Sequence, residues 1–336
     1  MPLFRRGDRI RSMAHYLLTG AAGFIGSHVA ELLLSAGHTV TGIDELNDAY
    51  DVRLKQWRLA RLRGRKGFSF RRISITDAEG VVLCMREHPP QAVINLAARA
   101  GVRASMENPG VYYAANVIGT LTLLEACRQC GVGKFILAST SSVYAGQPMP
   151  FSETLPVNEP ISPYAASKKA AEVTVYTYHH LYGIDAVVFR YFTVYGPAGR
   201  PDMSVFKFIH LISAGLPIKV FGDGLQSRDF TFVEDVAAGT VRGLSLSGFH
   251  TINLGGNHPS TLRELIGLIE QETGRKAQIA YGEFLRTDVK ATWADISRAR
   301  TLLGWEPTVS LAEGIRRTAE WHRQNESWLK DIRLEP

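Results

Sequence analysis

The chain has 336 residues, of which 45% are hydrophobic and 21% charged, and its net charge is +6 at pH 7. This length is enough for a large buried core and two lobes, and the composition is ordinary for a globular protein. No apolar run approaches the roughly 20 residues that a membrane helix needs, so no membrane partner is expected.

The first 13 residues are predicted to be a disordered extension. Residues 1–12 are basic, but no apolar segment with a small-residue cleavage site follows them, as a signal peptide would require. Met13 could equally be a translation start. The chain has three cysteines, which suggests a reducing compartment, and we expect the protein in the cytoplasm.

The basic residues form no long run, and the densest patches are residues 5–11 and 58–66. We interpret these patches as solvated surface rather than a nucleic-acid site, and a mildly basic balance suits a phosphorylated, anionic substrate. Cys127 and Cys130 have CxxC spacing, but they lie late in a helical pattern without a second pair. We therefore predict no metal or redox site there.

A glycine-rich turn near the N-terminus organises the chain. Residues 16–18 are a short apolar strand, residues 19–26 read TGAAGFIG, and residues 27–34 have apolar positions at helical spacing. Strand, turn and helix are typical of the opening of a dinucleotide-binding unit. Gly20 would permit the tight turn, Gly23 would let backbone N–H groups approach a pyrophosphate, and Gly26 would let the helix pack against the strand.

An acidic residue follows at the distance that such a unit requires. Residues 38–43 read as a second strand, and Asp44 stands at its end. A carboxylate there can accept hydrogen bonds from the adenosine ribose, and it would repel a 2′-phosphate. Glu45 adds to this repulsion, so NAD is favoured over NADP.

Strands and helices alternate through the first half of the chain. The predicted strands are residues 16–18, 38–43, 68–73, 92–96, 134–139 and 186–190. The predicted helices are residues 27–34, 50–62, 77–87, 112–130 and 164–182. This alternation predicts an α/β fold, a Rossmann-type doubly wound parallel sheet with crossover helices.

The rhythm breaks after about Gly196, where loops and short helices (262–273, 297–303 and 311–324) follow. We predict an NAD-binding domain over residues 14–195 and a smaller substrate lobe over residues 196–336, some of whose elements could return to the first domain. Ligands of such sheets lie at the carboxyl ends of the strands, so the residues that follow the strands are the candidates for chemistry.

Three of these candidates suit proton and hydride transfer. Thr140 follows the fifth predicted strand, and Tyr164 and Lys168 stand four residues apart on a predicted helix, hence on one face. The lysine charge would favour the phenolate and lower the tyrosine pKa, which makes Tyr164 a usable base. The Thr140 hydroxyl could bind the substrate oxygen, while Lys168 reaches the nicotinamide ribose. This grouping suits oxidation of an alcohol by NAD.

With these motifs the chain resembles the extended short-chain dehydrogenase/reductase family, in particular its nucleotide-sugar epimerases. Further matching stretches are residues 95–98, Asn116, residues 190–197 and residues 228–230. Residues 42–51, 100–103 and 192–203 are most similar to the members that epimerise UDP-glucuronate at C4. The resemblance covers nearly all of residues 14–325.

The resemblance implies a set of site residues. Thr140, Tyr164 and Lys168 would be catalytic. The residues that would hold NAD are Gly20, Gly23, Phe24, Ile25, Gly26, Asp44, Asn47, Ile75, Leu96, Ala97, Asn116, Tyr164 and Lys168. The residues that would bind substrate are Arg103, Ser141, Ser142, Thr193, Arg200, Arg228 and Asp288, with Arg200 and Arg228 on the diphosphate and Asp288 on the uridine ribose.

Three positions depart from the family pattern. Ser74 replaces the usual aspartate near the adenine, Asn95 replaces a histidine, and Glu45 stands where an asparagine is common. These departures put the individual contacts in doubt and leave the NAD assignment standing.

The same resemblance separates related reactions. A 4,6-dehydratase carries an Asp-Glu pair beside the threonine, where this chain has Ser141 and Ser142, and the charged residues of UDP-glucuronate decarboxylases are lacking there. The expected reaction is epimerisation of UDP-glucuronate to UDP-galacturonate through a transient 4-keto sugar, with NAD regenerated. We hypothesise that Ser141, Ser142 and Thr193 hold the C5 carboxylate of the 4-keto sugar, which could otherwise leave as carbon dioxide.

Other functions remain open. UDP-glucose/galactose 4-epimerisation would exchange the carboxylate for a neutral hydroxyl, and by resemblance Thr193 would then more often be asparagine. A UDP-glucuronate decarboxylase is less favoured, and a catalytically silent NAD-sensing protein would be expected to lose Tyr164 or Lys168. The resemblance also implies a homodimer through two helices per subunit, those that end near Cys130 and Tyr182.

Overall fold

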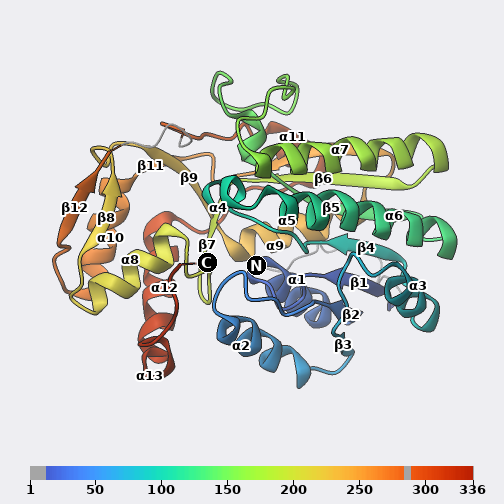
Figure 1. Ribbon diagram of the computed structural model, residues 1–336, viewed down its shortest axis with the longest axis horizontal. Coiled ribbons are helices and arrows are strands. Elements are labelled where there is room, and N and C mark those ends of the chain that lie inside the picture. The colour runs from blue at the N-terminus through green and yellow to red at the C-terminus, as the bar shows by residue number, and fades with distance from the viewer. Residues whose placement is uncertain (1–12, 284–288, 336) are drawn as a thin grey trace.

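Figure 1 shows the computed structural model, which describes residues 13–283 and 289–335. The predicted extension, apart from Met13, therefore lies outside the described residues, and so does Asp288. No helix within the described ranges is long and apolar enough to cross a membrane.

A seven-stranded sheet forms the centre of the molecule, and every pair of neighbouring strands in it is parallel. In spatial order its strands are β10 (Phe249–Leu254), β6 (Asp185–Tyr191), β5 (Lys134–Thr140), β4 (Ala92–Asn95), β1 (His15–Thr19), β2 (Thr39–Ile43) and β3 (Phe68–Arg71). The strand order reverses between β1 and β4, where a doubly wound sheet binds its ligand. The predicted fold class is confirmed.

Two helical layers bury the two faces of this sheet. Successive strand residues point to opposite faces, so Leu17 packs into one core cluster and Leu18 into another. The cluster around Leu18 includes side chains of α1 (Phe24–Ser35) and α9 (Val233–Arg242). The cluster around Leu17 includes those of α3 (Ala78–Glu87), α6 (Gly119–Cys130) and α7 (Pro163–Tyr182).

Several elements differ from the sequence-based expectation, and α9 is one that was not predicted. The helix expected over residues 112–130 is divided into α5 (Pro109–Tyr113), a π-helical segment (Ala114–Ile118) and α6. The seventh strand, β10, was not predicted, and it extends the sheet by pairing with β6. Cys127 is buried and Cys130 ends α6, and neither forms a disulfide.

A smaller lobe lies beside the carboxyl ends of the strands, at the left of Figure 1. Its core is one cluster of buried side chains that includes Phe208, Ile218, Phe232, Leu265 and Ile315. The elements of the lobe are β7 (Thr193–Tyr195), α8 (Ser204–Ser213), β8 (Ile218–Phe221), β9 (Ser227–Phe232), β11 (Pro259–Thr261), α10 (Leu262–Thr273), β12 (Ile279–Gly282), α12 (Leu311–Gln324) and α13 (Glu326–Leu329).

The remaining elements link the two parts. The helix α2 (Val52–Arg63) packs beside α1, and its Leu54 shares a core cluster with Trp321 and Ile332 from the end of the chain. The helix α2 begins after Asp51, whose carboxylate accepts a hydrogen bond from the Arg53 N–H group. Two further short helices are α4 (Val102–Glu107) and α11 (Ser297–Leu303).

Candidate active site

The glycine turn is so tight that it leaves no room for side chains at its glycine positions. Gly20 has a φ of 66°, and a Cβ atom on it would lie 2.7 Å from the Ala97 nitrogen. A Cβ atom on Gly26 would lie 2.1 Å from the Gly20 carbonyl oxygen. Gly23 caps α1 without a side-chain hydrogen bond, so the first N–H groups of the helix remain for a ligand.

A cavity of about 260 Å³ opens at this turn, over the carboxyl ends of the strands. Of the predicted site residues, Gly20, Gly23, Asp44, Asn47, Ile75, Leu96, Ala97 and Arg200 line its wall. Phe24 and Thr193 instead line a small neighbouring cavity of about 10 Å³, which shares Arg200 with the larger one. The turn and the cavity wall together have the shape and donors that a dinucleotide requires.

Asp44 lies at the end of β2 and is 8% exposed. Its carboxylate accepts hydrogen bonds from the N–H groups of Ala22, at 3.2 Å, and Leu46, at 2.8 Å. Burial raises its pKa, against the lowering effect of the nearby Lys55. The Lys55 Nζ atom donates to the backbone and side-chain oxygens of Asn47, both at 2.8 Å, and burial lowers its pKa to about 8.

Sequence reasoning missed several residues of the cavity wall. Tyr50, Lys55 and Arg99 line it, and none was predicted as a site residue. The patch over residues 58–66 was interpreted as solvated surface, which is wrong for Arg58, because only 1% of this residue is exposed. A signal was available, since Lys55 and Arg58 occupy the same helical stripe as the buried Leu54, Leu59 and Leu62.

The structure brings Thr140, Tyr164 and Lys168 together. The Ser162 side chain caps α7 by accepting from the Ala165 N–H group at 3.2 Å, which places Tyr164 in the first helical turn. The Tyr164 hydroxyl is hydrogen-bonded to the Thr140 side chain. Lys168 follows one turn later, and its Nζ atom donates to the Ala138 carbonyl oxygen on β5 at 2.8 Å.

The electrostatics of this group differ from the expectation. Burial raises the pKa of Tyr164, and the groups that lower it are the Thr140 hydrogen bond and the Arg200 charge, rather than Lys168. Burial lowers the pKa of Lys168 to about 8, while the charge of Glu172 raises it. The lysine can therefore gain or lose its proton near the pH of the cell.

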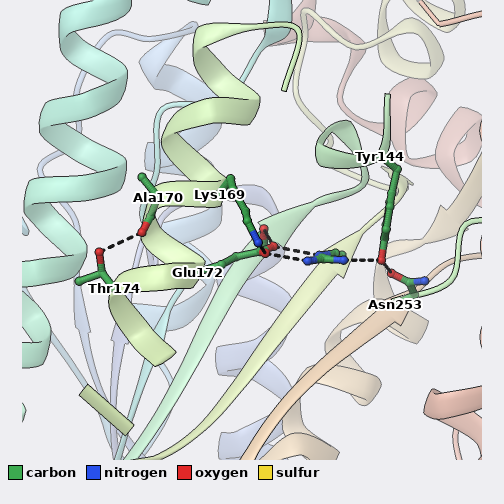
Figure 2. A network of polar contacts seen from close by, with 8 residues as sticks. Tyr144, Lys169, Ala170, Glu172, Thr174 and Asn253 are labelled. Carbon is green, nitrogen blue, oxygen red and sulfur yellow. Dashed lines mark hydrogen bonds and ion pairs between the residues drawn. The ribbon is translucent and has the colours of Figure 1, made fainter. Parts of the chain in front are cut away.

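Figure 2 shows a buried polar network that adjoins this group in the chain, since Ser139 precedes Thr140 and Glu172 follows Lys168 by one turn of α7. Arg190 on β6 donates to both carboxylate oxygens of Glu172, at 3.0 and 2.8 Å. Arg190 also donates to the Tyr144 hydroxyl, at 2.7 Å, and this hydroxyl donates to the Asn253 side chain at 2.9 Å. Glu172 also accepts from Ser139 at 2.6 Å, so the network ties α7 to β5, β6 and β10.

The π-helical segment positions Asn116 for a bridging role. Its side chain accepts from the Arg99 N–H group at 2.9 Å and donates to the Arg99 carbonyl oxygen at 3.0 Å. It also donates to the Ser167 hydroxyl at 2.9 Å, which fixes the loop after β4 against α7. Asn95, a departure from the family pattern, is buried and accepts from the Thr19 hydroxyl at 2.7 Å.

The small hydroxyl residues follow the ends of two neighbouring strands. Thr140 lies opposite Tyr191 in the parallel pair of β5 and β6, so Ser141 and Thr193 both lie just beyond this point. The Thr140 hydroxyl donates to the Ser142 hydroxyl at 3.1 Å, and the Ser142 N–H group donates back to Thr140 at 3.1 Å.

Three arginines were predicted to bind substrate, and only Arg200 lines the cavity. Arg200 forms an ion pair with Asp202 at 2.6 Å and donates to the Ala100 carbonyl oxygen at 3.1 Å. The Arg103 guanidinium lies 4.5 Å from the centre of the Phe221 ring, in the smaller lobe. Arg228 donates to the Ser227 carbonyl oxygen at 2.8 Å, and the remaining predicted ligand, Asp288, lies outside the described residues.

This sheet, its glycine turn and the clustered Thr, Tyr and Lys side chains define a Rossmann-type dinucleotide-binding enzyme. The chain belongs to the extended short-chain dehydrogenase/reductases, within the family described as GDP-mannose 4,6 dehydratase, which it matches over residues 17–318. The predicted family is thereby confirmed.

Individual relatives of this chain carry names that specify an activity within the family. The chain is 54% identical to a UDP-glucuronate 4-epimerase of Thermodesulfobacterium geofontis, over 96% of this chain and 100% of the relative. It is 37% identical to the crystallised UDP-glucuronic acid 4-epimerase of Bacillus cereus in complex with UDP-glucuronic acid and NAD, with a TM-score of 0.88 over 93% of this chain and 99% of the other. A UDP-glucose 4-epimerase of Thermotoga maritima with UDP-glucose is 33% identical, with a TM-score of 0.86 over 93% and 99%.

Proposed function

We propose that the protein is an NAD-dependent isomerase that epimerises UDP-glucuronate at C4, giving UDP-galacturonate. The observation that carries this assignment is the 54% identity to a UDP-glucuronate 4-epimerase along the full length of that relative. This similarity extends over 323 residues, so it supports the expected function with far more of the chain than the site motifs alone.

The residues at the turn fit NAD. The glycine turn has no space for a side chain, α1 offers free N–H groups, and a cavity runs from the turn to Asp44. Gly20, Gly23 and Phe24 to Gly26 would hold the pyrophosphate, and Asp44 and Asn47 the adenosine ribose. When bound, NAD accepts the hydride from C4 of the sugar and returns it to the opposite face.

The protein residues manage the proton of the same alcohol. Tyr164 accepts the proton of the C4 hydroxyl and later returns it, while the Thr140 hydroxyl hydrogen-bonds the same oxygen. Lys168 lies on α7, its Nζ atom donates to Ala138 on β5, and in its protonated form it would place a positive charge beside this group. The interaction between the Thr140 and Tyr164 hydroxyls supports this assignment, because it places the two groups next to each other.

The substrate would lie between the two lobes, with its diphosphate on arginine side chains. Arg200 lines the cavity, and a guanidinium fork matches phosphate oxygens. Arg228, Arg103 and Asp288 remain proposed ligands by family resemblance. Ser141, Ser142 and Thr193 would hold the sugar carboxylate, and the register of β5 and β6 supports their proximity.

UDP-glucose/galactose 4-epimerisation is the second candidate. The UDP-glucose 4-epimerase of Thermotoga maritima has nearly the same fold, with a TM-score of 0.86, but it is only 33% identical. The two activities differ in the group at C6, and the hydroxyls at positions 141, 142 and 193 suit a carboxylate.

A homodimer is part of the proposal. Large apolar side chains stand exposed on neighbouring helices, between 37% and 59%, and they are Ile118, Leu121, Val173, Tyr176, Leu181 and Tyr182. Such a surface is typical of an interface between protein chains. We expect Val173→Arg to give a monomer in sedimentation velocity, whereas Leu83→Arg, at an exposed position on α3, leaves the dimer intact.

The function is tested by incubating the purified protein with UDP-glucuronate, without added cofactor, and following the sugar by NMR. Appearance of UDP-galacturonate is the expected result, and Tyr164→Phe should abolish it. UDP-pentose as the main product would indicate a decarboxylase, and conversion of UDP-glucose but not UDP-glucuronate would indicate the second candidate. No turnover of either sugar, even with added NAD, would overturn the proposal.

A further inference from the structure

Arg58 is a buried arginine on α2 whose guanidinium group is fully hydrogen-bonded. Its Nε and Nη2 atoms donate to the Ala198 carbonyl oxygen at 2.9 and 2.7 Å, and Nη2 also donates to the Gly199 carbonyl oxygen at 3.0 Å. Its Nη1 atom donates to the Tyr50 hydroxyl at 2.7 Å and to the Ala22 carbonyl oxygen at 3.3 Å. These contacts use all five N–H groups that a guanidinium offers.

None of the acceptors is a carboxylate. In the part of the chain that the structure describes, Arg58 forms no ion pair, although it is 1% exposed. Its Cζ atom lies 5.9 Å from the ring centre of Phe24 and 5.5 Å from that of Tyr50, which compensates part of the lost hydration. A buried cation is costly to a fold, so a purely structural link would be served better by apolar side chains.

Arg58 joins two segments of the proposed ligand site, the glycine turn and the residues before Arg200. Ala22 belongs to the glycine turn between β1 and α1, and Ala198 and Gly199 directly precede Arg200. Ala198 has a φ of 55°, a left-handed conformation that is unfavourable for alanine, and two hydrogen bonds to its carbonyl oxygen hold it there.

A second contact secures the same segment. The His28 ring on α1 is hydrogen-bonded to the backbone of Pro197, one residue before Ala198. Arg200 in turn reaches across to the Ala100 carbonyl oxygen at 3.1 Å. Residues 197–200 are therefore fixed one after another against the first domain, and the side chain at the end of this series lines the cavity.

We infer that Arg58 is a positioning residue that locks residues 197–200 onto the glycine turn and so holds Arg200 in place for the substrate diphosphate. This inference rests on the proposed function and deepens it, because it links retention of NAD to affinity for the nucleotide part of the substrate. A lysine keeps the charge but has three donors on one atom, so it cannot span acceptors on both segments.

The test compares Arg58→Lys with Arg61→Lys. Arg61 lies one turn further along α2, at the surface, where it pairs with Glu31 at 3.0 Å. For Arg58→Lys, the dissociation constant of UDP in calorimetry and the KM for UDP-glucuronate should both rise about tenfold, the scale of one lost charged hydrogen bond. The kcat should change less than the KM, because Tyr164 and Thr140 are attached to other elements and only the charge of Arg200 couples Tyr164 to this segment. Arg61→Lys should leave all three unchanged.

The cofactor side has its own measurement. The NAD that remains per chain after gel filtration, released by acid and quantified, should fall for Arg58→Lys and not for Arg61→Lys. Unchanged NAD content and unchanged UDP affinity in Arg58→Lys would overturn the inference, even if its Tm falls. If the wild type binds UDP and NAD but epimerises no UDP-glucuronate, the proposed function fails while these two measurements still decide the role of Arg58.

A second variant covers the case in which Arg58→Lys does not fold. Tyr50→Phe removes only the hydroxyl that accepts from Nη1 and keeps the ring beside the guanidinium. We expect a smaller change in the same direction, about twofold to threefold in UDP affinity and a partial loss of NAD. Wild-type values for both in this variant would also overturn the inference.

Discussion

The Nζ atom of Lys168 donates a 2.8 Å hydrogen bond to the carbonyl oxygen of Ala138. This contact ties α7 to β5 beside Thr140, so it fixes the base and the hydroxyl partner relative to each other. It also buries the ammonium group, with the lysine 4% exposed and its pKa lowered to about 8. The pH dependence of stability should report this burial.

We expect the stability difference between wild type and Lys168→Met to depend on pH. The folded-state pKa of about 8 lies below the unfolded value of about 10.4, so the unfolded chain binds more protons between these values. Below pH 8 the buried Lys168 ammonium group therefore lowers the free energy of unfolding of the wild type, and this destabilisation disappears as the pH rises toward about 10.4. Urea unfolding at pH 7 and pH 10 should show wild type gaining on the order of 2 kcal/mol relative to Lys168→Met. A difference that is the same at both pH values would contradict the prediction.

Glu172→Gln should be strongly destabilising. Glu172 and Arg190 are both buried, and they form a bidentate ion pair within the network of Figure 2. Removing one charge leaves the other buried without a partner, which costs about 3–5 kcal/mol. Lys169→Gln is the matched control, because Lys169 lies 3.8 Å from the same carboxylate but is only half-buried, and it should cost less than about 1 kcal/mol. Equal unfolding midpoints for the two variants would exclude this account.

The sequence was sufficient for elements with strong local patterns. The apolar strand before the glycine turn, the turn itself and the amphipathic helices over residues 262–273, 297–303 and 311–324 are each determined by neighbours in the chain. They occur in the structure at the predicted places, and α10, α11 and α12 have the predicted bounds. The clustering of Thr140, Tyr164 and Lys168 was also predictable, because parallel strands bring their carboxyl ends to one edge.

What could not be predicted depends on distant partners. β10 is a strand because it extends an existing sheet beside β6, which its own residues do not encode. Arg58 is buried because the carbonyl oxygen of Ala198, 140 residues away, accepts its hydrogen bonds. Likewise the pKa of Tyr164 depends on Arg200, which reaches it from another part of the chain.

Gly26→Ala should remove NAD binding. The added Cβ atom would lie 2.1 Å from the Gly20 carbonyl oxygen, and this atom belongs to backbone that cannot move without opening the turn. We expect a loss of about 1–3 kcal/mol in stability and no retained NAD after gel filtration. Gly267→Ala lies in the interior of α10 with nothing within 4 Å, so it should stabilise by about 0.5–1 kcal/mol and leave NAD in place. Retention of NAD by the Gly26 variant would refute the proposed role of the turn.

Thr193→Ala should make the enzyme release carbon dioxide. The proposed 4-keto sugar is a β-keto acid, and it loses carbon dioxide when the C5–C6 bond lies parallel to the π orbitals of the C4 carbonyl group, which then take up the electron pair as an enolate. Thr193 follows β6, and Ser141 and Ser142 follow the neighbouring strand β5. The three hydroxyl groups can therefore hold the carboxylate away from that alignment.

We expect Thr193→Ala to yield UDP-pentose beside UDP-galacturonate, and labelled carbon dioxide from UDP-glucuronate carrying carbon-13 at C6. Thr193→Ser keeps the hydroxyl and should stay close to wild type. NMR of the reaction gives both products at once. If Thr193→Ala forms no more pentose than Thr193→Ser, the carboxylate must be held by other groups, and Ser141 and Ser142 alone remain to be tested in the same assay.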